Sequence, residues 1–187
     1  RVWSEEELDN VLKICQKHAL LVVSDEIHQD FVMGRRKFVP AAVVGGGKYR
    51  DILITFNAAS KTFNLASLNY SHVIITNETL MKKYDQCVAG ISRMQASLMG
   101  QIATKAGYEG GEEWLEALKG VICDNYDYVK TTFARELPKI VLCSMEGTYL
   151  PLLDLREYVK PENTHEFVQE RCRLGVDYGE WFGDKFK

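Results

Sequence analysis

One short apolar run followed by a lysine constrains this chain more than any other feature. Ile52–Phe56 is rich in β-branched and aromatic residues and is followed by small residues, a pattern that predicts a fully buried strand ending in a tight turn. Lys61 then lies at the carboxyl end of that strand, the edge at which open α/β sheets bind ligands. A lysine held there in apolar surroundings loses solvation, so its pKa falls and its amine becomes a nucleophile or a base. The alternative is a surface lysine that follows a strand.

A second apolar run, Ala19–Val23, ends in the same way with Ser24 and Asp25. If the two runs form neighbouring parallel strands, Asp25 and Lys61 lie at the same sheet edge. We therefore expect a carboxylate and an amine to face one site.

The segments Ser24–His28 (SDEIH) and Ser60–Ala66 (SKTFNLA), at this separation, resemble the pyridoxal-phosphate (PLP) enzymes of the class I/II aminotransferase family. More narrowly, they are similar to its cystathionine β-lyase, or C–S lyase, branch of the PatB/MalY type. Gly147–Leu150, Leu153–Arg156 and Gly175–Val176 continue the likeness, which covers nearly the whole chain.

The resemblance implies a role for four residues. Lys61 would be the Schiff-base lysine and Asp25 the partner of the cofactor's ring nitrogen, His28 would donate a hydrogen bond to the phenolate oxygen, and Ser60 would help to hold the phosphate. For His28, the alternative is an ordinary polar loop residue. The sequence departs from many relatives at Ala58, where a phosphate-binding serine is common, and at Asn69, where arginine is common.

The implied activity is β-elimination on cystathionine or a cysteine conjugate, which yields pyruvate, ammonia and a thiol. The alternatives are an aminotransferase with the same cofactor residues and a catalytically inactive piece that only folds or dimerises. A hydrolase with Ser60 as its nucleophile is disfavoured, since no Ser-x-x-Lys spacing is present.

The elements predict an α/β fold with a mostly parallel or mixed sheet covered on both faces, and the resemblance implies that this fold is PLP-transferase-like. Residues 1–110 are expected to be part of the large domain. Residues 111–187 are expected to hold a long connecting helix and part of a small α+β domain. Expected helices span residues 5–18, 80–88, 91–106 and 112–137, and a third apolar strand covers 73–76. Gly45–Gly47 is expected to be a surface loop rather than a phosphate loop.

Beyond Pro138, residues 140–143 and 148–153 predict a hairpin. A helix to about Leu174 with Gly175 at its C′ position should follow, and Val176–Tyr178 should begin another strand. The glycine-containing phosphate turn and the arginine for the substrate carboxylate, which relatives carry, are not found. The chain is thus expected to be the middle and later part of such an enzyme, and the isolated piece to be insoluble or tightly associated.

The composition argues against several classes of binding partner. A net charge of -3 in 187 residues gives no electrostatic case for nucleic acid or for an anionic membrane surface. The five cysteines and four histidines show no metal-ligand spacing, so no metal is expected. The longest apolar runs are far shorter than the ~20 residues of a membrane helix. We expect a cytoplasmic homodimer that acts on a small amino acid.

Overall fold

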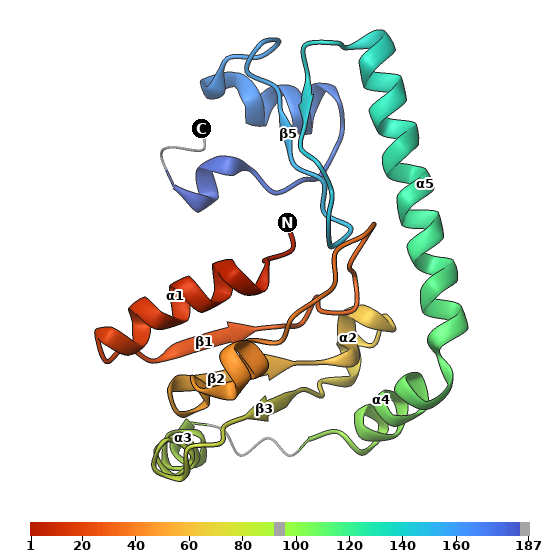
Figure 1. Cartoon of the computed structure of the whole chain (residues 1–187). Coiled ribbons are helices and arrows are strands. Elements are labelled where there is room, and N and C mark those ends of the chain that lie inside the picture. Colours follow the sequence, from red (N-terminus) through yellow and green to blue (C-terminus); the bar gives the residue numbers. More distant parts are fainter. Residues whose placement is uncertain (92–95, 184–187) are drawn as a thin grey trace. The chain divides into compact units, whose positions relative to one another are not determined.

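The computed structural model describes residues 1–91 and 96–183 (Figure 1). The chain forms two compact units. Unit 1 holds Arg1–Ile122 together with Glu146–Tyr149, and unit 2 holds Cys123–Met145 and the residues from Leu150 onward. The assignment of residues 1–110 and 111–187 to a large and a small domain stays a prediction.

Unit 1 is built on a three-stranded sheet in the order β1-β2-β3. The strands are β1 (Val22–Asp25), β2 (Leu53–Asn57) and β3 (His72–Ile74). β1 and β2 are parallel, whereas β2 and β3 are antiparallel. The described sheet is therefore mixed rather than mostly parallel.

Helix α1 (Glu5–Lys17) begins with the capping box that the sequence predicts. The Ser4 hydroxyl accepts a hydrogen bond from the Glu7 N–H at 3.2 Å, and a Glu7 carboxylate oxygen accepts one from the Ser4 N–H at 2.8 Å. These bonds satisfy donors that a helix start leaves unpaired. The Ser4 N–H and the Ser4 hydroxyl, which also donates to the Glu7 carboxylate at 2.9 Å, hold the pKa of Glu7 down at about 2, with a smaller contribution from Arg1.

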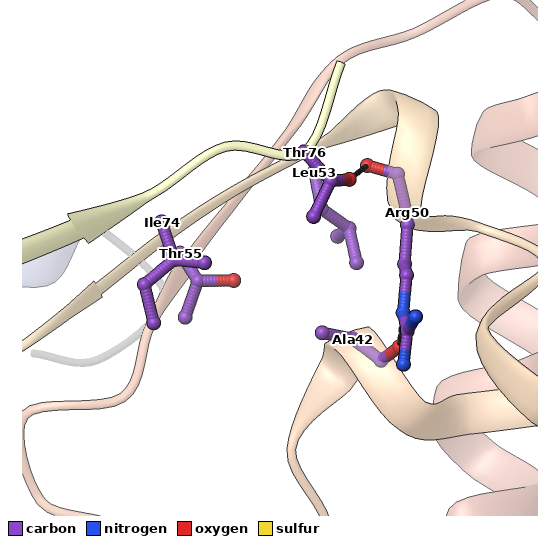
Figure 2. Close-up of a pocket in the computed structure, with 6 residues that line it drawn as sticks. All are labelled: Ala42, Arg50, Leu53, Thr55, Ile74 and Thr76. Carbon is purple, nitrogen blue, oxygen red and sulfur yellow. Dashed lines mark hydrogen bonds between the residues drawn. The ribbon is translucent and has the colours of Figure 1, made fainter. Parts of the chain in front are cut away.

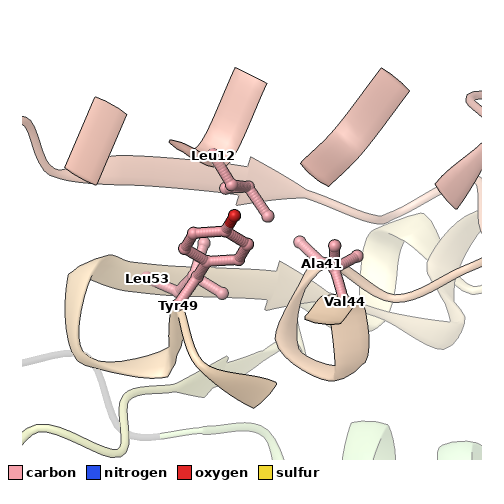
Figure 3. Packing of buried hydrophobic residues seen from close by; sticks show 5 residues of the cluster. All are labelled: Leu12, Ala41, Val44, Tyr49 and Leu53. Atoms are coloured by element: carbon pink, nitrogen blue, oxygen red, sulfur yellow. The ribbon is translucent and has the colours of Figure 1, made fainter. Parts of the chain in front are cut away.

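The core of unit 1 lies between α1 and the sheet. Figure 3 shows Leu12 of α1 facing Tyr49 and Leu53, with Ala41 and Val44 of the 3₁₀ segment η1 (Ala41–Gly47) beside them. The Tyr49 hydroxyl donates a 2.9 Å hydrogen bond to Asp9 Oδ1, so its polar end is satisfied at the helix surface. Burial of these apolar side chains fixes α1 on the sheet.

The opposite face of the sheet is only partly covered. Val23 of β1 is 64% exposed there, although Phe56 of β2 has a ring contact with Tyr84, and β2 itself includes half-buried as well as buried positions. The predictions of a fully buried strand 52–56 and of a sheet covered on both faces are therefore wrong for the described residues. Because β1 alternates between half-buried and exposed positions, it behaves as a strand with one packed face.

The remaining helices of unit 1 follow the strands. They are α2 (Ala59–Thr62), α3 (Glu78–Ile91) and α4 (Leu98–Gly110), with the short 3₁₀-helices η2 (Arg50–Ile52) and η3 (Ala66–Leu68). The predicted helix over 91–106 lies partly on residues 92–95, which are outside the described residues; the described α4 extends beyond it to Gly110. Gly45, Gly46 and Gly47 all have positive φ, which explains glycine at the end of η1.

The segment Glu146–Tyr149 belongs to unit 1, not to the predicted hairpin. Its Gly147 pairs with Val32, the Met33 N–H donates to the Glu146 carbonyl at 2.8 Å, and the Thr148 N–H donates to the Phe31 carbonyl at 2.8 Å. The prediction that residues 148–150 belong to a hairpin strand is thus wrong: none of them is in a strand, and the Thr148 N–H is bonded to Phe31 instead.

Helix α5 (Glu112–Glu136) contributes residues to both units and ends just before Pro138, as predicted. In unit 2, β4 (Val141–Leu142) pairs antiparallel with β5 (Leu153–Asp154), which confirms a hairpin with shorter strands than expected. The Tyr126 hydroxyl of α5 donates to the Cys143 carbonyl at 2.9 Å.

The last part of unit 2 departs from the prediction. After η4 (Pro161–Asn163), a helical segment with π-type bonding, η5 (Glu166–Arg171), ends at Arg171 and Arg173 takes φ +55°. Gly175 is therefore not at the C′ position. Val176–Tyr178 forms no strand; the 3₁₀-helix η6 (Gly179–Phe182) follows it.

Candidate active site

Lys61 is carried by α2, a single turn that begins directly after β2. Ala58 precedes the turn in an extended conformation and provides no side-chain cap. Ala59 and Thr62 are fully buried whereas Lys61 is exposed. The prediction of apolar surroundings for Lys61 is therefore wrong for the described chain: the turn packs its other face inward and leaves the lysine in solvent.

Asp25 is the last residue of β1 and lies opposite Phe56 of β2. Its Oδ1 accepts a 3.2 Å hydrogen bond from the Ile27 N–H, while its carboxylate stays exposed. The prediction that Asp25 and Lys61 follow neighbouring parallel strands at one sheet edge is confirmed.

The side chain of the next residue, Glu26, points into the interior of unit 1. Glu26 is buried and accepts hydrogen bonds from the Ser24 hydroxyl at 2.9 Å and from the Ala41 N–H at 3.0 Å. Glu26 therefore anchors the strand end, which leaves Asp25 as the carboxylate that faces outward.

His28 lies within electrostatic range of both predicted partners. Burial lowers its pKa below the ordinary 6.5, the positive charge of Lys61 lowers it further, and the negative charge of Asp25 opposes the change. Its ring contacts Tyr149 edge-on at 5.7 Å and Phe31 at 6.5 Å between ring centroids. The structure thus brings Lys61, Asp25 and His28 into one site.

The Nδ1 atom of His28 is buried and finds no hydrogen-bond partner within residues 1–91 and 96–183. An unsatisfied buried polar atom costs about 1–3 kcal/mol. Such an atom calls for an explanation, and a polar group of a bound molecule is one that fits this position.

Ser60 is half-buried on α2, next to Lys61, and its carbonyl accepts the Leu65 N–H at 2.9 Å. Its role in holding a phosphate stays a prediction. Asn69, a position where arginine is common in relatives, has φ +48° and is exposed.

Three residues at this site were missed by the sequence reasoning. Tyr149 reaches His28 from far along the chain, and Asp30 accepts a 2.7 Å hydrogen bond from Thr62. Asp30 follows the first motif by two residues and Thr62 lies within the second, but nothing in the sequence indicates that they pair.

The pocket shown in Figure 2 is not part of this site. Its volume is about 10 Å³, room for about one water molecule. The Thr76 hydroxyl donates to the Arg50 carbonyl at 3.2 Å there, and Arg50 Nε donates to the Ala42 carbonyl at 3.0 Å. Leu53, Thr55 and Ile74 complete the lining, which includes none of the predicted site residues.

Within residues 1–91 and 96–183, no group of three or more His, Cys, Asp or Glu residues could hold a metal ion. Within the same ranges, no helix combines the length and the apolar character required to cross a membrane.

Comparison with known proteins decides the family. Residues 1–178 match the family described as aminotransferase class I and II. The chain belongs to this family. Its PLP-dependent relatives confirm the resemblance read from SDEIH and SKTFNLA.

Three known proteins are similar to most or all of this chain. The chain is 31% identical to the protein MalY of Escherichia coli over 96% of its length, and 32% identical to the cystathionine β-lyase PatB of Bacillus subtilis over 84%. It also superimposes on PLP-containing cystalysin of Treponema denticola with a TM-score of 0.94 at 32% identity, over 100% of this chain and 47% of that one.

The matched regions make up 47% of MalY and 41% of PatB, so the chain spans about half the length of the curated relatives it matches or less. The cofactor of this family's enzymes is pyridoxal 5′-phosphate, and solved structures similar to this chain contain it.

Proposed function

We propose that the protein is a PLP-dependent carbon–sulfur β-lyase that converts cystathionine or a cysteine conjugate into pyruvate, ammonia and a thiol. The observation that carries the proposal is the placement of Asp25 and Lys61 beyond adjacent parallel strands, with His28 within range of both. Relatives named cystathionine β-lyase, at about 30% identity, support the lyase, and relatives named aminotransferase support the alternative.

The residues present fit the cofactor. A ring held between an amine and a carboxylate needs a further polar contact on its edge, and the unpartnered Nδ1 of His28 offers one. The exposed side chains of Lys61 and Asp25 are both open to a bound molecule.

When bound, PLP withdraws electrons from the substrate's Cα, so that a proton can leave that carbon. Lys61 would hold the cofactor through Nζ and, with the substrate amine in its place, would accept the Cα proton. Departure of the thiolate from Cβ would complete the elimination, and hydrolysis of the released aminoacrylate by water would give pyruvate and ammonia.

Asp25 acts through its charge. An anion at the tip of β1 favours the protonated form of a ring nitrogen placed against it. His28, with its lowered pKa, is neutral near pH 7 and can donate one hydrogen bond without adding a positive charge beside Lys61. Ser60, adjacent to Lys61, is proposed to contribute a hydroxyl to the phosphate.

The decisive experiment incubates the full-length protein with PLP and cystathionine and measures pyruvate without any added 2-oxo acid. A lyase forms pyruvate steadily under these conditions. An aminotransferase, the second candidate that the family description supports, forms product only when a 2-oxo acid is supplied. No turnover in either assay would leave the catalytically inactive protein as the answer.

A homodimer in the cytoplasm completes the proposal. Apolar side chains at the start of α4 support association, since Leu98, Met99 and Ile102 are 69%, 62% and 53% exposed. Sedimentation of the full-length protein tests the dimer, and a monomer at micromolar concentration would contradict it.

A further inference from the structure

The helical turn that carries Lys61 has little intrinsic stability. α2 spans the four residues Ala59–Thr62 and has no side-chain N-cap. Isolated helices much shorter than about 12 residues are marginal in water, so tertiary contacts must fix the direction of this turn.

Thr62, the residue after Lys61, provides a tertiary contact for this turn. Thr62 is 0% exposed, and its hydroxyl donates a 2.7 Å hydrogen bond to Asp30 Oδ2. Successive side chains of a helix point about 100° apart. Pinning Thr62 inward therefore sets the direction in which Lys61 leaves the turn.

Asp30 also binds a second donor. The Tyr108 hydroxyl of α4 donates to the same Oδ2 at 3.2 Å, and burial, followed by the charge of Asp30, raises the pKa of Tyr108. Hydrogen bonds to a charged carboxylate are about twice as strong as neutral ones. One carboxylate oxygen thus ties α2 to α4.

Asp30 belongs to the same turn as His28. The Phe31 N–H donates to the His28 carbonyl at 3.0 Å, and the Gln29 N–H donates to the Glu26 carbonyl at 3.0 Å, so residues 26–31 form one bonded loop after β1. Through the Thr62–Asp30 hydrogen bond, this loop and the turn that carries Lys61 are held in a fixed position relative to each other.

Phe63, the residue after Thr62, packs against α4. Its ring meets Tyr108 edge-on at 5.5 Å, and a Cβ added to Gly107 would come within 2.6 Å of it. α4 can approach α2 this closely because glycine is present there. The hydrogen bonds of Asp30 therefore lie beside a close contact between Phe63 and α4.

We propose that Asp30, with Thr62 and Tyr108, is a positioning residue that aims the Lys61 amine at the site formed by Asp25 and His28. The inference rests on the proposed role of Lys61. Neither Thr62 nor Asp30 needs to touch the substrate or the cofactor.

The test compares Thr62→Val, which keeps the shape and removes the donor, with Thr62→Ser, which keeps the hydroxyl, in the full-length protein. In Thr62→Val we expect kcat for pyruvate formation to fall about tenfold, KM to change less, and the pH midpoint of the bound cofactor's visible absorption band to shift. Thr62→Ser should restore both. Thr131→Val is the matched control, since the Thr131 hydroxyl bonds only to carbonyls of its own helix in the described contacts.

A merely structural role predicts a different result. It would lower the thermal midpoint of the cofactor-free protein and leave the absorption midpoint of the loaded protein unchanged, and that outcome would overturn the proposal. If Thr62→Val does not fold, Tyr108→Phe removes the second, partly exposed donor and should shift the absorption midpoint in the same direction by less. An unchanged midpoint there would also overturn the proposal.

Failure of the proposed function and failure of the positioning role give different experimental results. A wild-type protein without a cofactor absorption band refutes the function proposed for Lys61. A wild-type band that Thr62→Val and Tyr108→Phe both leave unmoved refutes only the positioning role of Asp30.

Discussion

Asp25 of β1 lies opposite Phe56 of β2 in a parallel pair, so its carboxylate ends at the sheet edge from which the Lys61 turn departs. In open α/β sheets this edge is where ligands bind. A carboxylate and an amine on adjacent strand ends can therefore contact one bound ring.

Lys61→Ala should remove the amine that accepts the substrate proton. We expect pyruvate formation from cystathionine to fall by at least about 10²–10⁴-fold, the range attributed to a positioned acid or base. Lys82→Ala, at an exposed position of α3, is the control and should retain wild-type turnover. Similar rates in the two variants would count against Lys61.

Asp25→Asn keeps the size of the side chain and removes its charge. Since the charge is proposed to stabilise a protonated ring nitrogen, we expect kcat to fall by about 10²–10³-fold, as for loss of one electrostatic contact in other sites. Asp51→Asn, an exposed carboxylate of η2, should leave kcat unchanged. Steady-state kinetics at saturating PLP distinguish the two results.

His28 should make folding sensitive to mild acid. Its pKa is lowered by burial and by Lys61, so between about pH 6.5 and its lowered folded pKa the unfolded chain takes up a proton that the folded chain does not. Its contribution to stability is full above this interval and is lost as the pH falls through it.

The measurement is urea unfolding of the cofactor-free full-length protein at pH 7 and pH 5. We expect the loss of unfolding free energy between these values to be smaller in His28→Gln than in the wild type. His18→Gln, at an exposed helix end, should behave as the wild type. Equal pH dependence in all three proteins would be inconsistent with a lowered pKa of His28.

Leu12→Ala tests the packing of α1 on the sheet. Leu12 is 2% exposed in the core with Tyr49 and Leu53, and truncation of a buried leucine costs about 2–5 kcal/mol of unfolding free energy. Val11→Ala, at a 42% exposed position, should cost less than about 1 kcal/mol. A similar cost for both would mean that this face of α1 does not carry the core.

Local signals made much of the fold predictable. The capping box at Ser4 and Glu7 places the start of α1, Pro138 places the end of α5, and the apolar run 52–56 places β2 to within one residue. Each of these signals lies within the element it specifies, so neighbouring residues are sufficient to read it.

Long-range pairing was not predictable in this way. Residues 146–148 look like part of a hairpin by composition, but their backbone pairs with residues 31–33. Arg173, rather than Gly175, takes the left-handed conformation after η5, which moves the end of that helix. No local residue preference favours arginine there.

The candidate site was likewise predictable only in part. Two apolar runs that end in Asp25 and near Lys61 suggested a shared edge, and the parallel pairing confirms it. The exposure of Lys61 and the Thr62–Asp30 bond depend on which face of α2 packs inward, and the sequence of a four-residue turn does not determine that face.

The central claim is that the Lys61 amine holds the cofactor. Full-length protein loaded with PLP is reduced with borohydride, digested and mapped by mass spectrometry. The account predicts one modified lysine, Lys61, in the peptide that contains SKTFNLA, and loss of the modification in Lys61→Ala. Modification of a different lysine, or none in a protein that retains the cofactor's absorption band, would contradict it.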